Sequence, residues 1–154
     1  MYASSRKARL VAIGPALPQA DTGAPMPAAA MTEEAVALAY EAADGRRVVV
    51  RFSGVQSVLL GAPNDETLNA HPLYGRGLRH YEFAEVEHSP WIAELEQANR
   101  VHPRHSPESF ADLRHFILPF HDSTFECVAR SVEVVGESDD VLATAAKSID
   151  PNTT

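Results

Sequence analysis

The chain has 154 residues, of which 45% are hydrophobic and 22% charged, so it can bury the core of one domain and lacks the composition of a disordered protein. Its formal net charge of −8 repels phosphate backbones and anionic lipids, which disfavours nucleic acid and membrane as partners. Apolar runs such as 55–62 are far shorter than the roughly 20 residues that a membrane helix needs.

The first 31 residues are rich in Ala, Pro and Gly and show no sustained periodicity. We expect 1–31 to be a disordered leader, because such a segment buries too little apolar surface to offset its ordering entropy. Basic residues at 6–9 followed by apolar residues at 10–13 resemble an export signal, but a Gly-Pro pair ends the apolar run early. A leader, or an extension ahead of a natural start at Met26 or Met31, fits better, and a cytoplasmic protein is expected.

A single folded α+β domain is predicted over 34–135, and it begins with a β-hairpin. Apolar residues alternate along 36–40 and again along 48–52. A three-residue loop at 43–45 brings both apolar sets to one face and puts Gly45 where a bulge requires a positive φ. This register pairs Val36 with Phe52, Leu38 with Val50 and Tyr40 with Val48.

The middle of the chain combines strands, an irregular connection and two helix starts. Strands are predicted at 57–60 and 79–87, with an irregular connection over 61–78 that contains several Pro and Gly residues. The Ser-Pro pairs at 89–90 and 106–107 are typical of helix starts, with serine as the N-cap and proline in the first turn.

A second hairpin is predicted from His115 to about Val134, turning at Asp122 and Ser123. Because proline has no N–H, the strand that contains Pro119 should lie at an edge or lack one ladder bond. The predicted register pairs Phe120 with Phe125, Leu118 with Cys127 and Phe116 with Ala129 on one face, and Pro119 with Glu126 and Ile117 with Val128 on the other.

The last segment, 136–154, is expected to be a flexible acidic tail in which Ser138 caps a marginal helix. Taken together, the elements predict an α+β fold. Its mostly antiparallel sheet is built from the two hairpins and connecting strands, with one or two short helices packed on one face.

Cys127 is the one cysteine of the chain, so no internal disulfide can form, which favours a reducing compartment. In the predicted register its thiol lies on the apolar face, where it is poorly ionised, so a core role is expected rather than a nucleophile. The adjacent His121, Asp122 and Ser123 cannot easily form a hydrolytic triad, which draws its members from separated positions, and they are interpreted as turn residues.

Seven histidines raise the hypothesis of a metal site. His102 and His105 are close in sequence, but zinc needs three or four converging ligands, and Arg104 would place a cation beside the metal. We therefore expect no metal ligands and no cofactor. The alternative kept open is a small histidine- or metal-dependent enzyme that uses some of His71, His80, His102, His105 and His121.

The most suggestive stretch is the long connection from 64 to 80, because long irregular loops inside compact domains are often functional. It carries Tyr74, Arg76, Arg79 and His80, and Tyr and Arg are enriched at binding hot spots. Flanking glycines are expected to turn Arg76 outward, although a loop held only by its own prolines and glycines is the alternative interpretation. These residues predict a non-enzymatic binding or regulatory protein, of immunity or accessory type, that acts through a protein partner.

Overall fold

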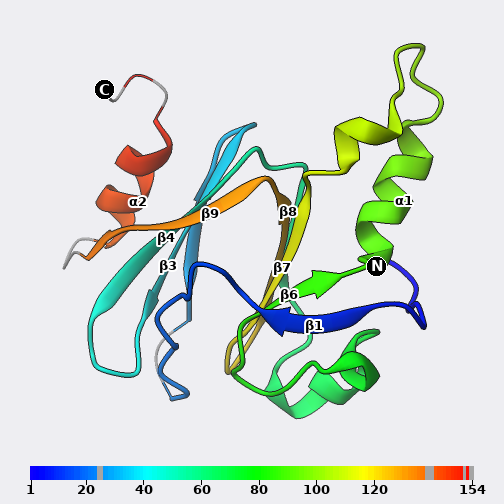
Figure 1. The fold of residues 1–154 in the computed structure, drawn as a ribbon. Helices are drawn as coiled ribbons and strands as arrows, with labels where there is room; N and C mark the ends of the chain where they lie inside the picture. The colour runs from blue at the N-terminus through cyan, green and yellow to red at the C-terminus, as the bar shows by residue number, and fades with distance from the viewer. Residues whose placement is uncertain (24–25, 138–140, 151, 153–154) are drawn as a thin grey trace.

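The computed structural model describes residues 1–23, 26–137, 141–150 and 152 of the chain. In these ranges nine strands form two antiparallel sheets that face each other, with short helices around them (Figure 1). The predicted α+β class with mostly antiparallel sheet is confirmed. The two hairpins do not share one sheet, however, because each lies in a different sheet.

The sheets have five and four strands, in the orders β1-β6-β7-β8-β5 and β2-β3-β4-β9. The five-stranded sheet consists of β1 (Arg9–Ala12), β5 (Ser57–Gly61), β6 (Ala84–Glu87), β7 (Arg114–Pro119) and β8 (Thr124–Ala129). The four-stranded sheet consists of β2 (Ala28–Met31), β3 (Ala35–Glu41), β4 (Arg47–Ser53) and β9 (Ser131–Glu137).

The main core fills the space between the sheets. Phe52 of β4 packs against two rings of the facing sheet, with centroid distances of 5.3 Å to Phe116 and 5.2 Å to Phe125. Cys127 is also fully buried there, as predicted, and burial raises the pKa of its thiol. The structure therefore supports a packing role for Cys127.

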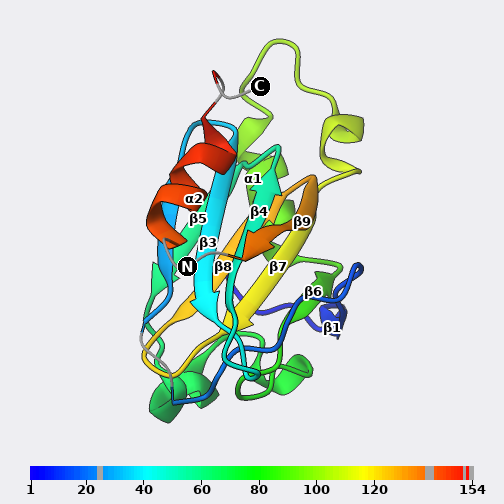
Figure 2. The same cartoon turned by 90° about the vertical axis from the view of Figure 1, so that its left-hand side faces the viewer.

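Helices cover the outer sides of both sheets. Figure 1 shows α1 (Pro90–Asn99) beside the five-stranded sheet and α2 (Val141–Ile149) beside the four-stranded sheet, and Figure 2 shows α2 lying along β3. Ser89 caps α1 as predicted, since its Oγ accepts a hydrogen bond from the Ile92 N–H at 3.1 Å. The described residues also include three 3-10 helices, η1 (Asp65–Ala70), η2 (Tyr74–Arg76) and η3 (Pro107–Phe110). No helix in the described ranges is long and apolar enough to span a membrane.

The first hairpin has the predicted register. Val36 pairs with Phe52, Leu38 with Val50 and Tyr40 with Val48, and Glu41 lies opposite Arg47. Gly45 adopts a φ of 85° in the loop, a conformation that favours glycine. The apolar alternation was sufficient here because the loop length decides which face of each strand points to the core.

The second hairpin has a register two residues away from the predicted one. Leu118, rather than Phe120, lies opposite Phe125, and Ile117 lies opposite Glu126. The turn has the expected two residues but begins one residue earlier: the Phe120 N–H donates to the Ser123 carbonyl, so His121 and Asp122 form the turn instead of Asp122 and Ser123. A shift of two residues keeps every side chain on its predicted face, so the alternation of apolar residues could not detect it.

The structure also differs from the expected ends. Within the predicted disordered leader, β1 pairs with β6 and β2 pairs with β3, and Tyr2 is only 3% exposed. Within the predicted flexible tail, β9 extends to Glu137 and α2 packs on β2, β3 and β4, while the proposed cap Ser138 lies outside the described residues. Both segments gain order by adding to existing sheet edges and faces.

The predicted strand over 79–87 is shorter in the structure. Only Ala84–Glu87 forms β6, because the chain turns just before it, with a hydrogen bond from Glu82 N–H to the Arg79 carbonyl and a φ of 60° at Tyr81. The turn brings the preceding loop back along the end of the five-stranded sheet. It thereby positions the residues that the sequence analysis singled out.

Candidate functional site

The connection between β5 and β6 is anchored by buried leucines. Leu68, Leu73 and Leu78 are each at most 3% exposed and belong to a second core outside the five-stranded sheet. Asn64 begins η1 by accepting hydrogen bonds from the N–H and hydroxyl groups of Thr67. These three buried leucines fix the backbone of the loop, and the side chains between them therefore have fixed positions on the surface.

Two of the four predicted contact residues touch each other. Tyr74 is 40% exposed and meets His80 edge-on with a centroid distance of 6.2 Å, and His80 Nε2 donates to the Asp65 carbonyl at 2.9 Å. Arg79 is exposed, but Arg76 is half-buried, so its guanidinium is less outward than expected. Neither arginine forms an ion pair with any described residue. We call Tyr74, Arg76, Arg79 and His80 the Tyr74 surface.

A second group of polar side chains lies buried beneath the loop and was not predicted. Glu126, on β8, is 2% exposed and receives hydrogen bonds from three side chains. The donors are the Tyr2 hydroxyl, His71 Nε2 at 3.0 Å and His115 Nε2 at 2.9 Å. Ser89 Oγ extends the group, because it lies 2.8 Å from His115 Nδ1. We call these five residues the Glu126 cluster.

The hydrogen bonds of the cluster define the position of the proton on the His71 ring. His71 Nδ1 accepts the Leu73 N–H at 3.1 Å, so its proton is on Nε2, which donates to Glu126. Ser89 Oγ accepts the Ile92 N–H and lies 2.8 Å from His115 Nδ1, a contact in which either the hydroxyl or the ring N–H can be the donor. A continuous chain then runs from the serine hydroxyl through the imidazole of His115 to the buried carboxylate.

The carboxyl group of Glu126 is held in its ionised form. Burial by itself raises its pKa, but the hydrogen bonds from His115 and His71, the attraction of His115 and the Tyr2 hydroxyl outweigh burial and bring the pKa to about 2. Burial and the neighbouring carboxylate raise the pKa of the Tyr2 phenol, which keeps its proton and acts as donor. The cluster therefore carries a stable buried negative charge, and both oxygens of the carboxylate accept hydrogen bonds.

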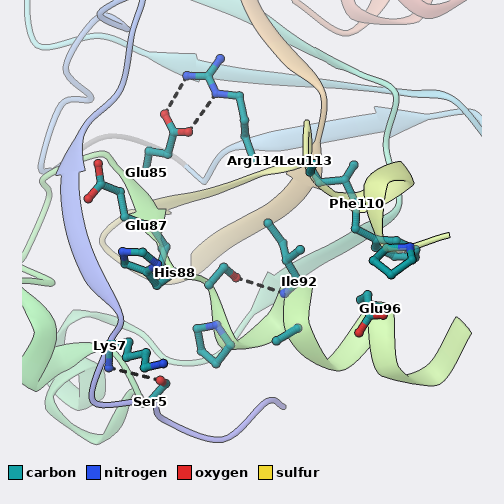
Figure 3. Close-up of a pocket in the computed structure, with 16 residues that line it drawn as sticks. Ser5, Lys7, Glu85, Glu87, His88, Ile92, Glu96, Phe110, Leu113 and Arg114 are labelled. Atoms are coloured by element: carbon teal, nitrogen blue, oxygen red, sulfur yellow. Dashed lines mark hydrogen bonds and ion pairs between the residues drawn. The ribbon is translucent and has the colours of Figure 1, made fainter. Parts of the chain in front are cut away.

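A groove beside α1 opens onto this cluster. It has a volume of about 850 Å³ and is lined by apolar Ile92, Phe110 and Leu113, with a bidentate ion pair between Glu85 and Arg114 at 2.7–2.9 Å (Figure 3). We call it the α1 groove. Ser89 lines the groove and is 8% exposed, whereas the other four cluster residues do not line it. Ser89 is thus the residue of the Glu126 cluster that is reached from the α1 groove.

The histidines singled out in the sequence do not meet at one point. His71 belongs to the Glu126 cluster, His105 Nε2 donates to the Glu96 carboxylate of α1, and His102 and His121 lie on exposed bends. Across the described residues, no three His, Cys, Asp or Glu side chains are arranged to hold a metal ion. The histidine that completes the relay, His115, was one of seven in the sequence, and no local pattern distinguished it.

Comparison with known proteins gives no relative from which a role could be transferred: no family model, no curated protein and no solved structure matches this chain.

Proposed function

We propose that the chain is a cytoplasmic binding or regulatory protein, of immunity or accessory type, that contacts a protein partner through the Tyr74 surface. The observation that supports this most directly is an exposed tyrosine beside two arginines that lack ion pairs within the described structure. Tyr and Arg are the residue types most enriched where binding energy concentrates. Other arginines, such as Arg9, Arg100 and Arg114, are already paired with glutamates.

The packing of the loop favours binding because its backbone is already ordered before a protein partner makes contact. Leu73 and Leu78 flank η2 and are buried, so the backbone that carries Tyr74 is fixed before a partner arrives. A preorganised contact avoids part of the entropy cost of association. Tyr74 would supply an apolar ring with a polar tip, and Arg79 would supply a planar donor for a carboxylate or phosphate group of the partner.

The test compares two double variants of the full chain. Tyr74→Ala with Arg79→Ala should leave the melting temperature nearly unchanged, because both side chains are exposed, and should weaken partner capture about tenfold or more. The matched control is Val101→Ala with Arg104→Ala, which removes an apolar and a cationic side chain from another exposed loop.

The measurement is quantitative capture from extract of the native host by each immobilised chain, followed by titration with the purified partner. Proteins retained by wild type and control but lost with the Tyr74 surface variant are the expected result. Equal retention by all three chains would contradict the proposal, and so would a large fall in the melting temperature of the Tyr74 variant.

A second candidate function is supported by the relay at the α1 groove: a histidine-dependent hydrolase that acts on an ester. Ser89 Oγ would attack the ester carbonyl carbon while its proton passes to His115 Nδ1, and Glu126 would stabilise the resulting imidazolium through Nε2–H. The departing alcohol takes the proton from Nδ1, and water then releases the acid by the same path. The ring nitrogens are used in the reverse order from the Ser-His-Asp template, in which the serine faces Nε2.

A fluorophosphonate probe tests the second candidate directly. We expect covalent modification of Ser89 in the wild-type chain and its loss in Ser89→Ala, which should also lower stability by about 1 kcal/mol through loss of the helix cap. Ser5→Ala is the matched control, since Ser5 also lines the groove but does not touch His115. Intact-protein mass spectrometry gives the result, and the absence of labelling in the folded wild type would exclude a reactive serine.

A further inference from the structure

Tyr2 is the one buried residue among the first seven. Tyr2 is 3% exposed, whereas Met1 is 72% exposed and Arg6 and Lys7 are exposed as well. Within the described structure, the Tyr2 hydroxyl makes the one hydrogen bond that joins residues 1–7 to residues beyond Ala8; the bonds from Ala8 N–H to the Ser5 carbonyl and from Lys7 N–H to Ser5 Oγ are local to the turn. We call residues 1–7 the N-terminal arm.

The site that receives the Tyr2 ring has the features that recognise a phenol. The ring stacks on Trp91, with centroids 5.7 Å apart and planes 23° apart. His71 and His115 meet it edge-on at 6.2 Å and 5.4 Å, and its hydroxyl donates to the Glu126 carboxylate. One stacked face, two edge contacts and a charged acceptor at the para position select an aromatic ring with a hydroxyl group over a plain aromatic ring.

We propose that this site binds phenols, and that the N-terminal arm is a displaceable plug that fills it with Tyr2. Tyr2 is the one buried residue of the arm, so an incoming phenol has to displace a single side chain and its contacts rather than a whole strand or helix. Because the arm is tethered, its effective concentration is high, and the wild-type chain binds an added phenol more weakly than a chain without the Tyr2 ring.

The phenol could be a small molecule or a tyrosine side chain of another polypeptide, and the two sources share the same recognition chemistry. This inference does not depend on the Tyr74 surface or on the reactivity of Ser89. It concerns the buried side of the Glu126 cluster, whereas the α1 groove reaches the cluster only at Ser89.

The experiment uses the full chain with Tyr2→Ala, which empties the ring site and leaves His71 and His115 on Glu126. By calorimetry, p-cresol should bind this variant about tenfold or more tightly than 4-methylanisole or toluene, because only p-cresol donates a hydrogen bond to the carboxylate. It should also bind the variant more tightly than it binds wild type. A blocked peptide with the sequence Ala-Tyr-Ala-Ser identifies the source: tighter binding than p-cresol indicates a tyrosine of a polypeptide, and binding of p-cresol alone indicates a small phenol.

Equal affinities for p-cresol and 4-methylanisole, or no binding of either, would overturn the proposal. If Tyr2→Ala does not fold, trypsin cleavage of the wild-type chain after Arg6 and Lys7 decides the question. Saturating p-cresol should accelerate this cleavage by releasing the arm, whereas toluene should not. Cleavage at the same rate with and without p-cresol would show that the arm is not displaced.

Discussion

Glu126→Ala is expected to lower the free energy of unfolding by about 3–5 kcal/mol at neutral pH, because it removes the acceptor shared by three buried donors. The Nε2–H groups of His71 and His115 and the Tyr2 hydroxyl would then be buried without an acceptor, and each unsatisfied group carries its own desolvation cost. Urea denaturation followed by circular dichroism measures the change. The matched control, Glu133→Ala, removes a half-exposed carboxylate paired with Arg51 and should cost about 1 kcal/mol or less.

The same carboxylate makes the wild-type protein sensitive to acid. Its pKa is about 2 in the folded chain against 4.5 for the ordinary group, so its contribution is fully present above about pH 4.5 and is lost as pH falls through 2. The difference corresponds to about 3 kcal/mol. We expect the stability gap between wild type and Glu126→Ala to narrow from pH 5 toward pH 2. A gap that stays constant over this range would show that Glu126 is not ionised in the fold.

Phe52→Ala should cost about 3–5 kcal/mol, because the ring is fully buried and contacts two phenylalanines of the opposite sheet. Truncation leaves a cavity between sheets that are held together mainly by such contacts, and the fixed strands on both sides can close it only in part. Thermal and urea unfolding give the magnitude. Tyr74→Ala serves as the aromatic control, since that ring is 40% exposed and its loss should be small. Similar losses for both variants would contradict the face-to-face packing of the two sheets.

For Phe52, the sequence indicates burial in a core but does not identify the residues that the ring contacts. Phe52 could be assigned to a core from the sequence, because it alternates with Val48 and Val50 along a strand and the loop at Gly45 fixes the register. Its contact with Phe116 and Phe125 could not be assigned, because alternation shows which side of a strand is apolar but not which other strand covers that side. Alternation therefore predicts both hairpins but does not show that they lie in two different sheets.

The Glu126 cluster shows where prediction from sequence stops. Along β8, the apolar alternation places Phe125 and Cys127 toward the facing sheet and leaves Glu126 on the other side. A charged residue on the second side of a strand is ordinarily solvated. Here that side is covered by α1, the loop over 61–78 and the N-terminal arm, so every residue of β8 is buried. Nothing in the sequences of these covering elements indicates that they lie over Glu126.

Local interactions in this chain were therefore determined by the sequence itself: the three-residue hairpin loop at Gly45, the Ser89 cap of α1, and the burial of Cys127 on an apolar face. Each depends on residues a few positions apart or on strict alternation, which a single sequence displays. Only the tertiary structure decided the second hairpin's register, which keeps the same faces after a two-residue shift, and the site at Glu126. Tyr2 and Glu126 are 124 positions apart, and no spacing rule connects residues at that distance. Their contact exists because two sheets, a helix and an N-terminal segment pack together, which is a property of the whole fold.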